Sequence, residues 1–387
     1  MLFPWLVAVY LLESPERLGL AQMSAQIPAV FLILVGGLIG DRFDQRRILL
    51  LVHLAAALPP WIMAWLIGRG DLSYALLILY ALTGGAINAI SQPARDALLN
   101  RVAGDAIQRT VTLVLGINFG IQIVGFGMAS LADTLGPVKL MLIQGSVVAL
   151  GVFAVLRLPP ATRTTDRVYQ HPLREIAEGL SICFRSPRIR PAWILTAAVG
   201  VFFVGTYIVL IPLIIRDIYH GNASDISLAF ACNMLGTILT TAFLVLRGGI
   251  HKQGRALLLG LFSGSLVIGL ITFNLPYWAF FVVIFLWGIG GGITMSMSRA
   301  IVQESAPKTH RARVMSVYSL AMLGGMPFGS LLMGYSVKFF GPLNAVLFPA
   351  GGVMLTVLVV HFTSSMWQLT PLSSPGFNDA GTTPETV

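Results

Sequence analysis

Long stretches without a charged residue limit most strongly what this chain can fold into. The longest of them, Ala256–Ser298, is divided by the turn-forming sequence Asn274-Leu275-Pro276. Each resulting run is close to the ~20 residues that an α-helix needs to cross about 30 Å of hydrocarbon. The sequence therefore predicts eleven full transmembrane helices, from the runs Leu18–Gly40, Ile48–Gly68, Leu72–Ala94, Thr110–Ala132, Leu140–Leu156, Pro191–Ile215, Ile226–Leu246, Ala256–Ser298 (two helices), Val314–Val337 and Phe339–Phe362.

The composition agrees with an all-α membrane protein. Charged residues make up 11% of the 387 residues and hydrophobic residues 56%, and the mean hydropathy is +0.82. Soluble domains carry roughly 25% charged residues, so this chain cannot cover a water-exposed surface of its size. The apolar runs are too long for barrel strands and lack their period-2 alternation, which argues against a transmembrane β-barrel.

The first residues form a shorter apolar segment. Met1–Leu12 would extend only about 18 Å as a helix, at roughly 1.5 Å per residue. It has no basic region before its apolar part, so a signal peptide is a poor interpretation. We expect it to be the second half of a truncated helix 1, which gives a fold with eleven full transmembrane helices plus a partial first helix.

The distribution of Lys and Arg predicts the orientation. With the loop Asp41–Arg47 in the cytoplasm, 20 of the 25 basic residues lie on the inner side. This bias accounts for the net charge of +9 without a nucleic-acid partner. We therefore expect a multi-pass protein of the bacterial inner membrane with a cytoplasmic C-terminus. The five basic residues assigned to the outside are Arg17, Arg69, Lys139, Arg216 and Lys338.

The chain divides into two similar halves. Leu135-Gly136-Pro137 has a counterpart 205 residues later in Phe340-Gly341-Pro342. Parallel six-helix repeats with a midplane substrate site are a common transporter architecture. The predicted domains are an N-terminal half (1–157), a cytoplasmic central loop (158–190), a C-terminal half (191–362) and a disordered cytoplasmic tail (363–387). In the loop, His171–Phe184 has the periodicity of an amphipathic helix, which would rest on the membrane or the bundle, or would bind a regulatory partner.

The loop after the first full helix carries the sharpest motif, Gly36-Gly37-Leu38-Ile39-Gly40-Asp41-Arg42-Phe43-Asp44-Gln45-Arg46-Arg47. Glycines allow close helix packing, and a carboxylate at a helix end can accept hydrogen bonds from a facing helix N-terminus. We expect this contact to hold the inner ends of the halves together, as a cytoplasmic gate. The alternative is a positively charged turn without a gating role. The predicted gate residues are Gly37, Gly40, Asp41, Arg42, Arg46 and Arg47.

This motif resembles the loop pattern of the major facilitator superfamily, in the form found in the exporter branch with the enterobactin exporter and macrolide-type efflux proteins. Three further segments resemble the same branch: Gln92–Leu99, the loop around His171, and Gln303–Ser316. Asp44 and Gln45 depart from the pattern. The corresponding loop of the second half keeps only Gly254-Arg255, with His251 at the acidic position, so we expect the two gates to differ.

Uncharged polar residues within the apolar runs are the candidate substrate contacts. An unpaired amide in hydrocarbon is costly, so these side chains should face the bundle interior, where they either join helices or line a cavity. The resemblance implies a central cavity bordered by helices 1, 4, 7 and 10, which favours Tyr80, Asn88 and Tyr207. The candidates are Tyr80, Asn88, Asn118, Gln122, Tyr207, Asn233 and Thr237.

Catalytic and cofactor signals are missing. The sequence contains no phosphate-binding G-x-x-x-x-G-K-[ST] loop, no cysteine–histidine cluster for a metal and no paired catalytic groups within the apolar runs. The two cysteines, Cys183 and Cys232, cannot form a disulfide framework and should be free thiols. We therefore expect no enzymatic activity, no cofactor and no metal.

Together these observations predict a monomeric secondary active transporter. It would export small amphipathic compounds, a siderophore or a drug-like molecule, by alternating access and in exchange for protons. No Asp, Glu, Lys or Arg lies within the eleven runs, so the titrating group would be Asp41, His53 or a carboxylate in the missing half of helix 1. Two alternatives stay open: a facilitator or importer without proton coupling, and a transport-dead sensor or scaffold.

Overall fold

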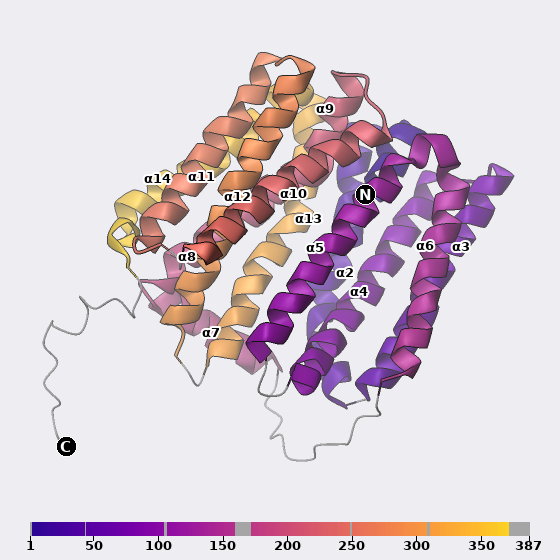
Figure 1. The fold of residues 1–387 in the computed structure, drawn as a ribbon. Coiled ribbons are helices and arrows are strands. Elements are labelled where there is room, and N and C mark those ends of the chain that lie inside the picture. Colours follow the sequence, from indigo (N-terminus) through magenta and orange to yellow (C-terminus); the bar gives the residue numbers. More distant parts are fainter. Residues whose placement is uncertain are drawn as a thin grey trace, which may run out of the picture.

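The chain folds into a bundle of long helices, as expected (Figure 1). The computed structural model describes residues 2–42, 44–103, 107–158, 172–247, 250–307 and 310–370, and these ranges contain no β-strand. The helices are α1 (Leu2–Trp5), η1 (Leu6–Tyr10), α2 (Pro15–Arg42), α3 (Gln45–Arg69), α4 (Tyr74–Ala103), α5 (Ile107–Ser130), α6 (Ala132–Leu156), α7 (Pro172–Arg185), α8 (Ile189–Ala198), η3 (Val199–Val204), η4 (Thr206–Leu210), α9 (Ile211–Asp217), α10 (Ala223–Leu246), α11 (Gln253–Gly269), η5 (Leu270–Phe273), α12 (Tyr277–Ser305), α13 (Arg311–Asn344), α14 (Leu347–Thr363) and η6 (Met366–Gln368).

Eight helical segments in the described ranges are long and apolar enough to cross a membrane. Each of the eleven predicted runs falls mainly on one helix or on one unbroken helical series. The described part of α5 and the 17 residues of α14 give shorter apolar segments, so the count of eleven full spans plus a partial one stays a prediction. The eight segments are Gln45–Arg69, Tyr74–Arg95, Ala132–Leu156, Ile189–Asp217, Ala223–Leu246, Gln253–Phe273, Tyr277–Ser305 and Arg313–Asn344.

Local chemistry explains where these helices begin and end. Asn274 has a left-handed backbone (φ 49°) and Pro276 precedes the first residue of α12, so the predicted break in the longest apolar run is confirmed. Asp44, which departs from the family pattern, accepts a hydrogen bond from the Arg46 backbone N–H (3.0 Å) and caps α3. Asn222 and Asp225 form a capping box at the start of α10.

Helices α1–α6 and α8–α14 form two groups that lie side by side, with α7 beneath the second group in the view of Figure 1. Gly136 and Gly341, paired by the sequence repeat, have nearly the same backbone angles (φ 78°, ψ 158° and φ 76°, ψ 163°). Only glycine adopts these angles without strain, which explains the residue type at both positions. The shared geometry supports a duplicated architecture, and the exact domain boundaries stay a prediction.

The central amphipathic helix forms and rests on the bundle. Glu178 of α7 pairs with Arg313 of α13, and Gly179 lets α7 approach the Arg313 carbonyl. Cys183 of α7 is buried, and both cysteines are free, as expected. His171 lies outside the described residues, and a regulatory partner for this helix stays a prediction.

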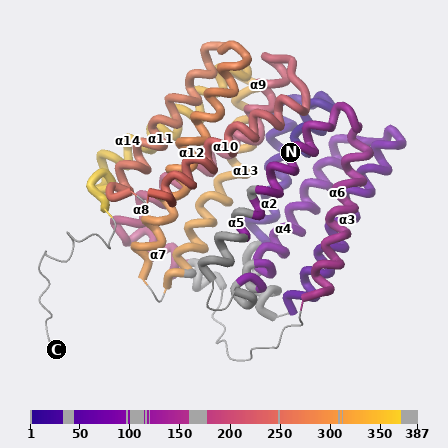
Figure 2. Tube along the Cα trace, in the orientation of Figure 1, coloured from indigo at the N-terminus to yellow at the C-terminus, as the bar shows by residue number. Residues whose placement is uncertain are grey.

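The bundle has two ends, which we name by one residue each. The Arg216 end contains the turns around Leu12, Gly70, Leu131, His220 and Asn274. The Arg46 end contains the starts of α3 and α11 and the ends of α6 and α14. The N-terminus lies between the two groups of helices (Figure 2), and Leu6, Val7 and Ala8 of η1 are fully buried there.

Candidate functional site

The two halves approach most closely where α2 crosses α13. A Cβ atom on Gly19 would lie 2.6 Å from the Ser330 carbonyl oxygen, and one on Gly334 would lie 2.6 Å from the Pro15 carbonyl oxygen. Both distances are too short for a real side chain, so glycine at each position allows the two backbones to touch. Further along α2, the Gln26 amide donates to the Ser330 hydroxyl (3.1 Å).

Arg216, near the end of the continuous helical series α8–η3–η4–α9, fastens the N-terminal segment. Its Nη1 donates to the carbonyl oxygens of Ala8 and Glu13, both at 2.9 Å, and its remaining nitrogens face Asp217. The side chain is only 16% exposed. Hydrogen bonds from a charged donor in such a place are stronger than neutral ones, and the loss of this side chain would leave two carbonyls unpaired.

Two other charged side chains join the halves at the same end. The Asp133 carboxylate of α6 accepts from the Ala223 backbone N–H (2.7 Å), at the positive N-terminus of α10, where a negative charge is favourable. Next to it, the Ser224 hydroxyl donates to the Ser130 carbonyl (2.8 Å). Lys338 of α13 pairs with Glu16 of α2 at 2.9 Å.

We call this set the Arg216 latch: Arg216 with Ala8 and Glu13, Asp133 with Ala223, Ser224 with Ser130, and Lys338 with Glu16. At the Arg46 end, two hydrogen bonds of described residues each lie within one half: Arg46 Nη2 donates to the Leu156 carbonyl (2.6 Å) and the Gln253 amide donates to Glu304 (3.1 Å). At the Arg216 end, the bonds of the latch join the two halves.

The predicted cytoplasmic gate lies at the opposite, Arg46 end. Gly37, Gly40, Asp41 and Arg42 are in the last turns of α2, where the side chains fall outside the described part of the structure. Arg46 joins the start of α3 to the end of α6, and Arg47 is exposed. The structure therefore leaves the gating role of Asp41 as a prediction and gives Arg46 a bond inside the first half.

The structure places the predicted Tyr207 in an aromatic cluster between helices. Its ring centroid lies 4.3 Å from that of Phe230 and 6.3 Å from that of Trp287. Phe126 of α5 reaches the same Phe230 from the other half (6.3 Å), and Phe203 packs edge-on against Trp287 (5.3 Å). Tyr207 lies in η4, a π-helical stretch, and such irregular turns are frequent at functional sites.

Tyr80 belongs to α4, in the N-terminal half of the chain. Its ring is 6.1 Å from Phe3, and its hydroxyl accepts a hydrogen bond from the Gln144 amide of α6 (3.1 Å). Asn88 follows two turns later on α4 and is exposed. Both residues thus come from the helix that the resemblance places at a central cavity.

Four more candidates fall into two pairs with different surroundings. Asn233 donates to the Ile284 carbonyl (3.3 Å) and Thr237 to the Gly288 carbonyl (3.0 Å), so both join α10 to α12. Asn118 and Gln122 of α5 are exposed and share a helix face with Phe126, which contacts the second half. The first pair joins helices, and the second pair is open to a ligand.

The polar groups of α2 and the latch are not among the residues that the sequence predicts as functional. Gln22 Nε2 and Gln26 Oε1 are buried without a hydrogen-bond partner in the described part of the chain, close to where α2 meets α13. A buried unpaired polar atom costs about 1–3 kcal/mol, which a bound water or substrate could offset. One feature of the sequence points to the latch. Arg216 and Lys338 are two of the five basic residues assigned to the outside.

Two other kinds of site are a metal site and a proton-coupling histidine. No group of three or more His, Cys, Asp or Glu side chains there could hold a metal ion. His53, a candidate for proton coupling, fits against Gly151 of α6, and its Nδ1 lies 2.7 Å from the Leu49 carbonyl oxygen. A packing role explains both contacts of this histidine.

Comparisons with known proteins agree with this architecture. The model of a family described as transmembrane secretion effectors, within the MFS transporters, matches residues 3–373. The chain is 22% identical over 366 residues to the staphyloferrin A transporter of Staphylococcus aureus (strain NCTC 8325 / PS 47), covering 91% of this chain and 88% of that protein. It is 25% identical over 356 residues to the uncharacterized MFS-type transporter YfiS of Bacillus subtilis (strain 168), covering 86% and 83%.

Solved structures share the fold at low sequence identity. The nucleoside transporter NupG superposes with a TM-score of 0.73 at 15% identity, covering 95% of this chain and 94% of that chain. An auto inhibited peptide transporter of the POT family superposes with a TM-score of 0.70 at 15% identity, covering 97% and 95%. These likenesses show the fold alone.

Proposed function

Because the chain belongs to the transmembrane secretion effector family of the major facilitator superfamily, and is thus a membrane transporter, we propose that it exports small amphipathic compounds by alternating access in exchange for protons. The observation that carries the proposal is the position of the Arg216 latch. A carrier that rocks about a central site closes one end at a time. The bonds between the halves at the Arg216 end fit a conformation that is closed there, and in this proposal the substrate site is accessible from the Arg46 end.

The proposed orientation follows from the basic residues. The Arg46 end faces the cytoplasm and the Arg216 end faces outside, in the bacterial cell membrane, with the C-terminus inside. In this orientation the described conformation takes up its substrate from the cytoplasm, as an exporter requires. Membership of the exporter branch with the enterobactin exporter and macrolide-type efflux proteins is part of the same proposal.

The substrate class follows from the side chains at the junction of the halves. Tyr207, Trp287 and Phe230 offer flat apolar faces, and Asn118 and Gln122 offer exposed amides nearby on α5. Such a surface suits a compound with both ring or chain carbons and hydrogen-bonding groups. A siderophore is one such compound, and a relative of this chain transports staphyloferrin A. A drug-like amphiphile is the other.

Proton coupling rests on a titrating group whose protonation changes the bonding between the halves. Asp41 is the first candidate, at the Arg46 end. Asp133 and Glu16 are carboxylates of the Arg216 latch and would bond more weakly to Ala223 and Lys338 when protonated. A proton from outside would thus favour opening of the latch.

Transport by membrane vesicles tests the proposal directly. Inside-out vesicles with a proton gradient should accumulate labelled staphyloferrin A or a lipophilic dye, and a protonophore should abolish the accumulation. Asp41→Asn should lower this transport at least tenfold. Asp44→Asn is the matched control three residues away, because asparagine caps a helix about as well as aspartate and should leave transport unchanged.

The alternatives predict different outcomes of the same assay. Accumulation only in right-side-out vesicles, or equilibration that ignores the gradient, would indicate an importer or a facilitator without proton coupling. Binding of either probe without movement would indicate a sensor or scaffold. Full transport by Asp41→Asn would remove the gating role from that residue.

A further inference from the structure

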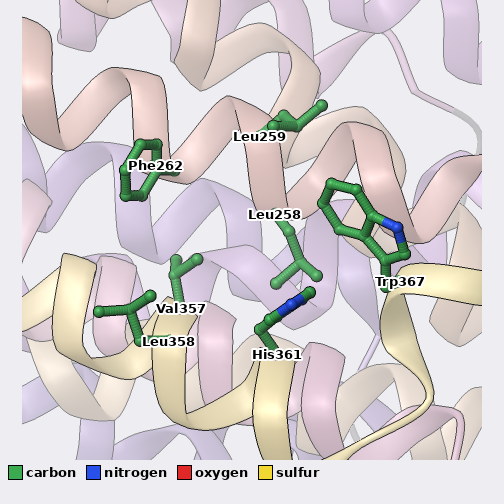
Figure 3. A pocket seen from close by; sticks show the side chains of 7 residues that line it. All are labelled: Leu258, Leu259, Phe262, Val357, Leu358, His361 and Trp367. Carbon is green, nitrogen blue, oxygen red and sulfur yellow. The ribbon is translucent and has the colours of Figure 1, made fainter.

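A groove between α11 and α14 lies away from the junction of the halves. It has a volume of about 400 Å³ and is lined by seven residues (Figure 3). Six of them have apolar or mainly apolar side chains and the seventh is a histidine. They are Leu258, Leu259, Phe262, Val357, Leu358, His361 and Trp367.

The two ends of the groove differ in polarity. Phe262, Val357 and Leu358 lie toward one end, and His361 and Trp367 lie toward the other (Figure 3). Helix α11 begins at Gln253, so its residues 255 to 262 lead away from the Arg46 end over about 10 Å, at ~1.5 Å per residue. The polar end of the groove therefore coincides with the Arg46 end of the bundle, and the apolar end points toward its middle.

The segment after α14 folds back and builds the polar end. The Gly254 backbone N–H donates to the Leu369 carbonyl (3.3 Å), and Arg255 Nε donates to the Trp367 carbonyl (3.1 Å). The Arg255 guanidinium also lies over the Trp367 ring (5.2 Å), and His361 packs edge-on against the same ring (5.2 Å). An indole held beside a guanidinium at a helix end is typical of a membrane–water interface.

The two segments that build this end carry basic groups. The described residues 250–255 and 357–370 contain cationic or titratable-cationic groups and no carboxylate. Glu304 is the carboxylate that a hydrogen bond brings closest, and it accepts from the Gln253 amide. The basic groups are Arg247 at the end of α10, His251, Lys252, Arg255 and His361.

From these observations we propose that the groove is a binding site for an anionic phospholipid. One acyl chain lies between α11 and α14 along Leu258, Phe262 and Leu358. The phosphate lies at the Arg46 end against Lys252 and Arg255, beside the indole of Trp367. Each basic residue near a membrane surface favours an anionic headgroup, so two of them select for phosphatidylglycerol over neutral lipid.

Fluorescence quenching by brominated lipids measures this site in the full chain. The protein is reconstituted in phosphatidylcholine vesicles that contain the same small share of brominated phosphatidylglycerol or of brominated phosphatidylcholine. The difference in emission between the protein and Trp367→Phe isolates Trp367 from the other six tryptophans. We expect this signal to be quenched several-fold more by brominated phosphatidylglycerol.

Charge variants locate the headgroup. Lys252→Gln, at an exposed position, should remove much of the preference, and Lys252→Gln with Arg255→Gln should remove all of it. The matched control is Arg299→Gln with Arg311→Gln, two exposed cations on α12 and α13, which should keep the preference. Equal quenching by both lipids in the unmodified protein would overturn the proposal, as would a preference that survives in the Lys252/Arg255 variant.

Discussion

The two ends of the bundle are built differently. At the Arg216 end, side chains from one half reach backbone and side-chain partners in the other half, and two glycines let α2 and α13 touch. At the Arg46 end, Arg46 and Gln253 bond within their own halves. The bonds between the halves fasten the Arg216 end in this conformation, and they can be altered one contact at a time.

The largest expected effect comes from the glycine contact. Gly334→Ala places a Cβ 2.6 Å from the Pro15 carbonyl and 3.0 Å from Gly19 Cα, so α2 and α13 must separate. Overpacking of this kind costs typically 1–3 kcal/mol. Thermal unfolding in detergent should show the loss of stability. An engineered cysteine in the middle of α5, Asn118→Cys, should also be labelled faster by a thiol reagent added at the Arg216 end.

Gly324→Ala is the control for this substitution on the same helix. A Cβ at Gly324 meets no other atom within 4 Å, and alanine favours a helix over glycine by up to about 1 kcal/mol. This variant should be as stable as the unmodified protein or more stable. Equal effects of the two substitutions would show that the contact between α2 and α13 does not matter.

Arg216→Gln should follow in size. The variant loses the charged donor to the Ala8 and Glu13 carbonyls, and because the glutamine amide can still donate to one of them, we expect a net loss of about 1–2 kcal/mol. The N-terminal segment should then be cleaved faster by a protease added at the Arg216 end. Arg69→Gln removes an exposed cation from the same end and should change stability by less than about 0.5 kcal/mol.

Asp133 distinguishes charge from hydrogen bonding. Asp133→Ala removes the acceptor at the start of α10 and should cost about 0.5–2 kcal/mol, whereas Asp133→Asn keeps an acceptor oxygen and should cost less. The unfolding midpoints of the two variants give the comparison. If both are as stable as the parent, Asp133 is not part of the latch.

The smallest effect is expected for Lys338→Gln. Its pair with Glu16 is partly exposed, and such pairs contribute about 0–1 kcal/mol and weaken in salt. The hydrogen bond from Lys338 lowers the pKa of Glu16, which lies ahead of the first apolar run. The contribution is therefore present above the ordinary carboxyl pKa and is lost as the pH falls through the lowered pKa of Glu16. A stability difference that persists at high salt or at low pH would contradict this origin.

The sequence predicted the helices well and the contacts between them poorly. Hydrocarbon thickness fixes the length of an apolar run, so Leu18–Gly40 and Ile226–Leu246 could be found by counting. Asp44 stands directly before a helix, and an aspartate in that place is typical of a helix N-cap. The comparison with the family motif, in contrast, marks Asp44 only as a departure from the pattern.

The latch could not be derived in the same way. Arg216 donates to the backbone carbonyls of Ala8 and Glu13. Every residue has such a carbonyl, so the residue types at positions 8 and 13 do not reveal these bonds. Asn233 and Asn118 are equally polar in sequence, yet one joins α10 to α12 and the other is exposed. Only packing distinguishes such residues, because both satisfy the same rule that polar groups avoid lipid.

The most direct test measures access to the middle of α5 from each side. Asn118→Cys is made with Cys183→Ser and Cys232→Ser, although burial raises the pKa of the Cys183 thiol to about 11 and should already keep it unreactive. Two further variants carry a cysteine at an exposed position, Thr134→Cys at the Arg216 end and Gln303→Cys at the Arg46 end. Their labelling shows which end of the protein faces outward in each vesicle preparation.

An impermeant thiol reagent is then added to vesicles of either orientation. We expect rapid labelling of Asn118→Cys from the side that labels Gln303→Cys and slow labelling from the side that labels Thr134→Cys. Addition of Gly334→Ala should raise the rate of labelling from the Thr134 side. Rapid labelling of Asn118→Cys from the Thr134 side with the latch intact would contradict a closed Arg216 end.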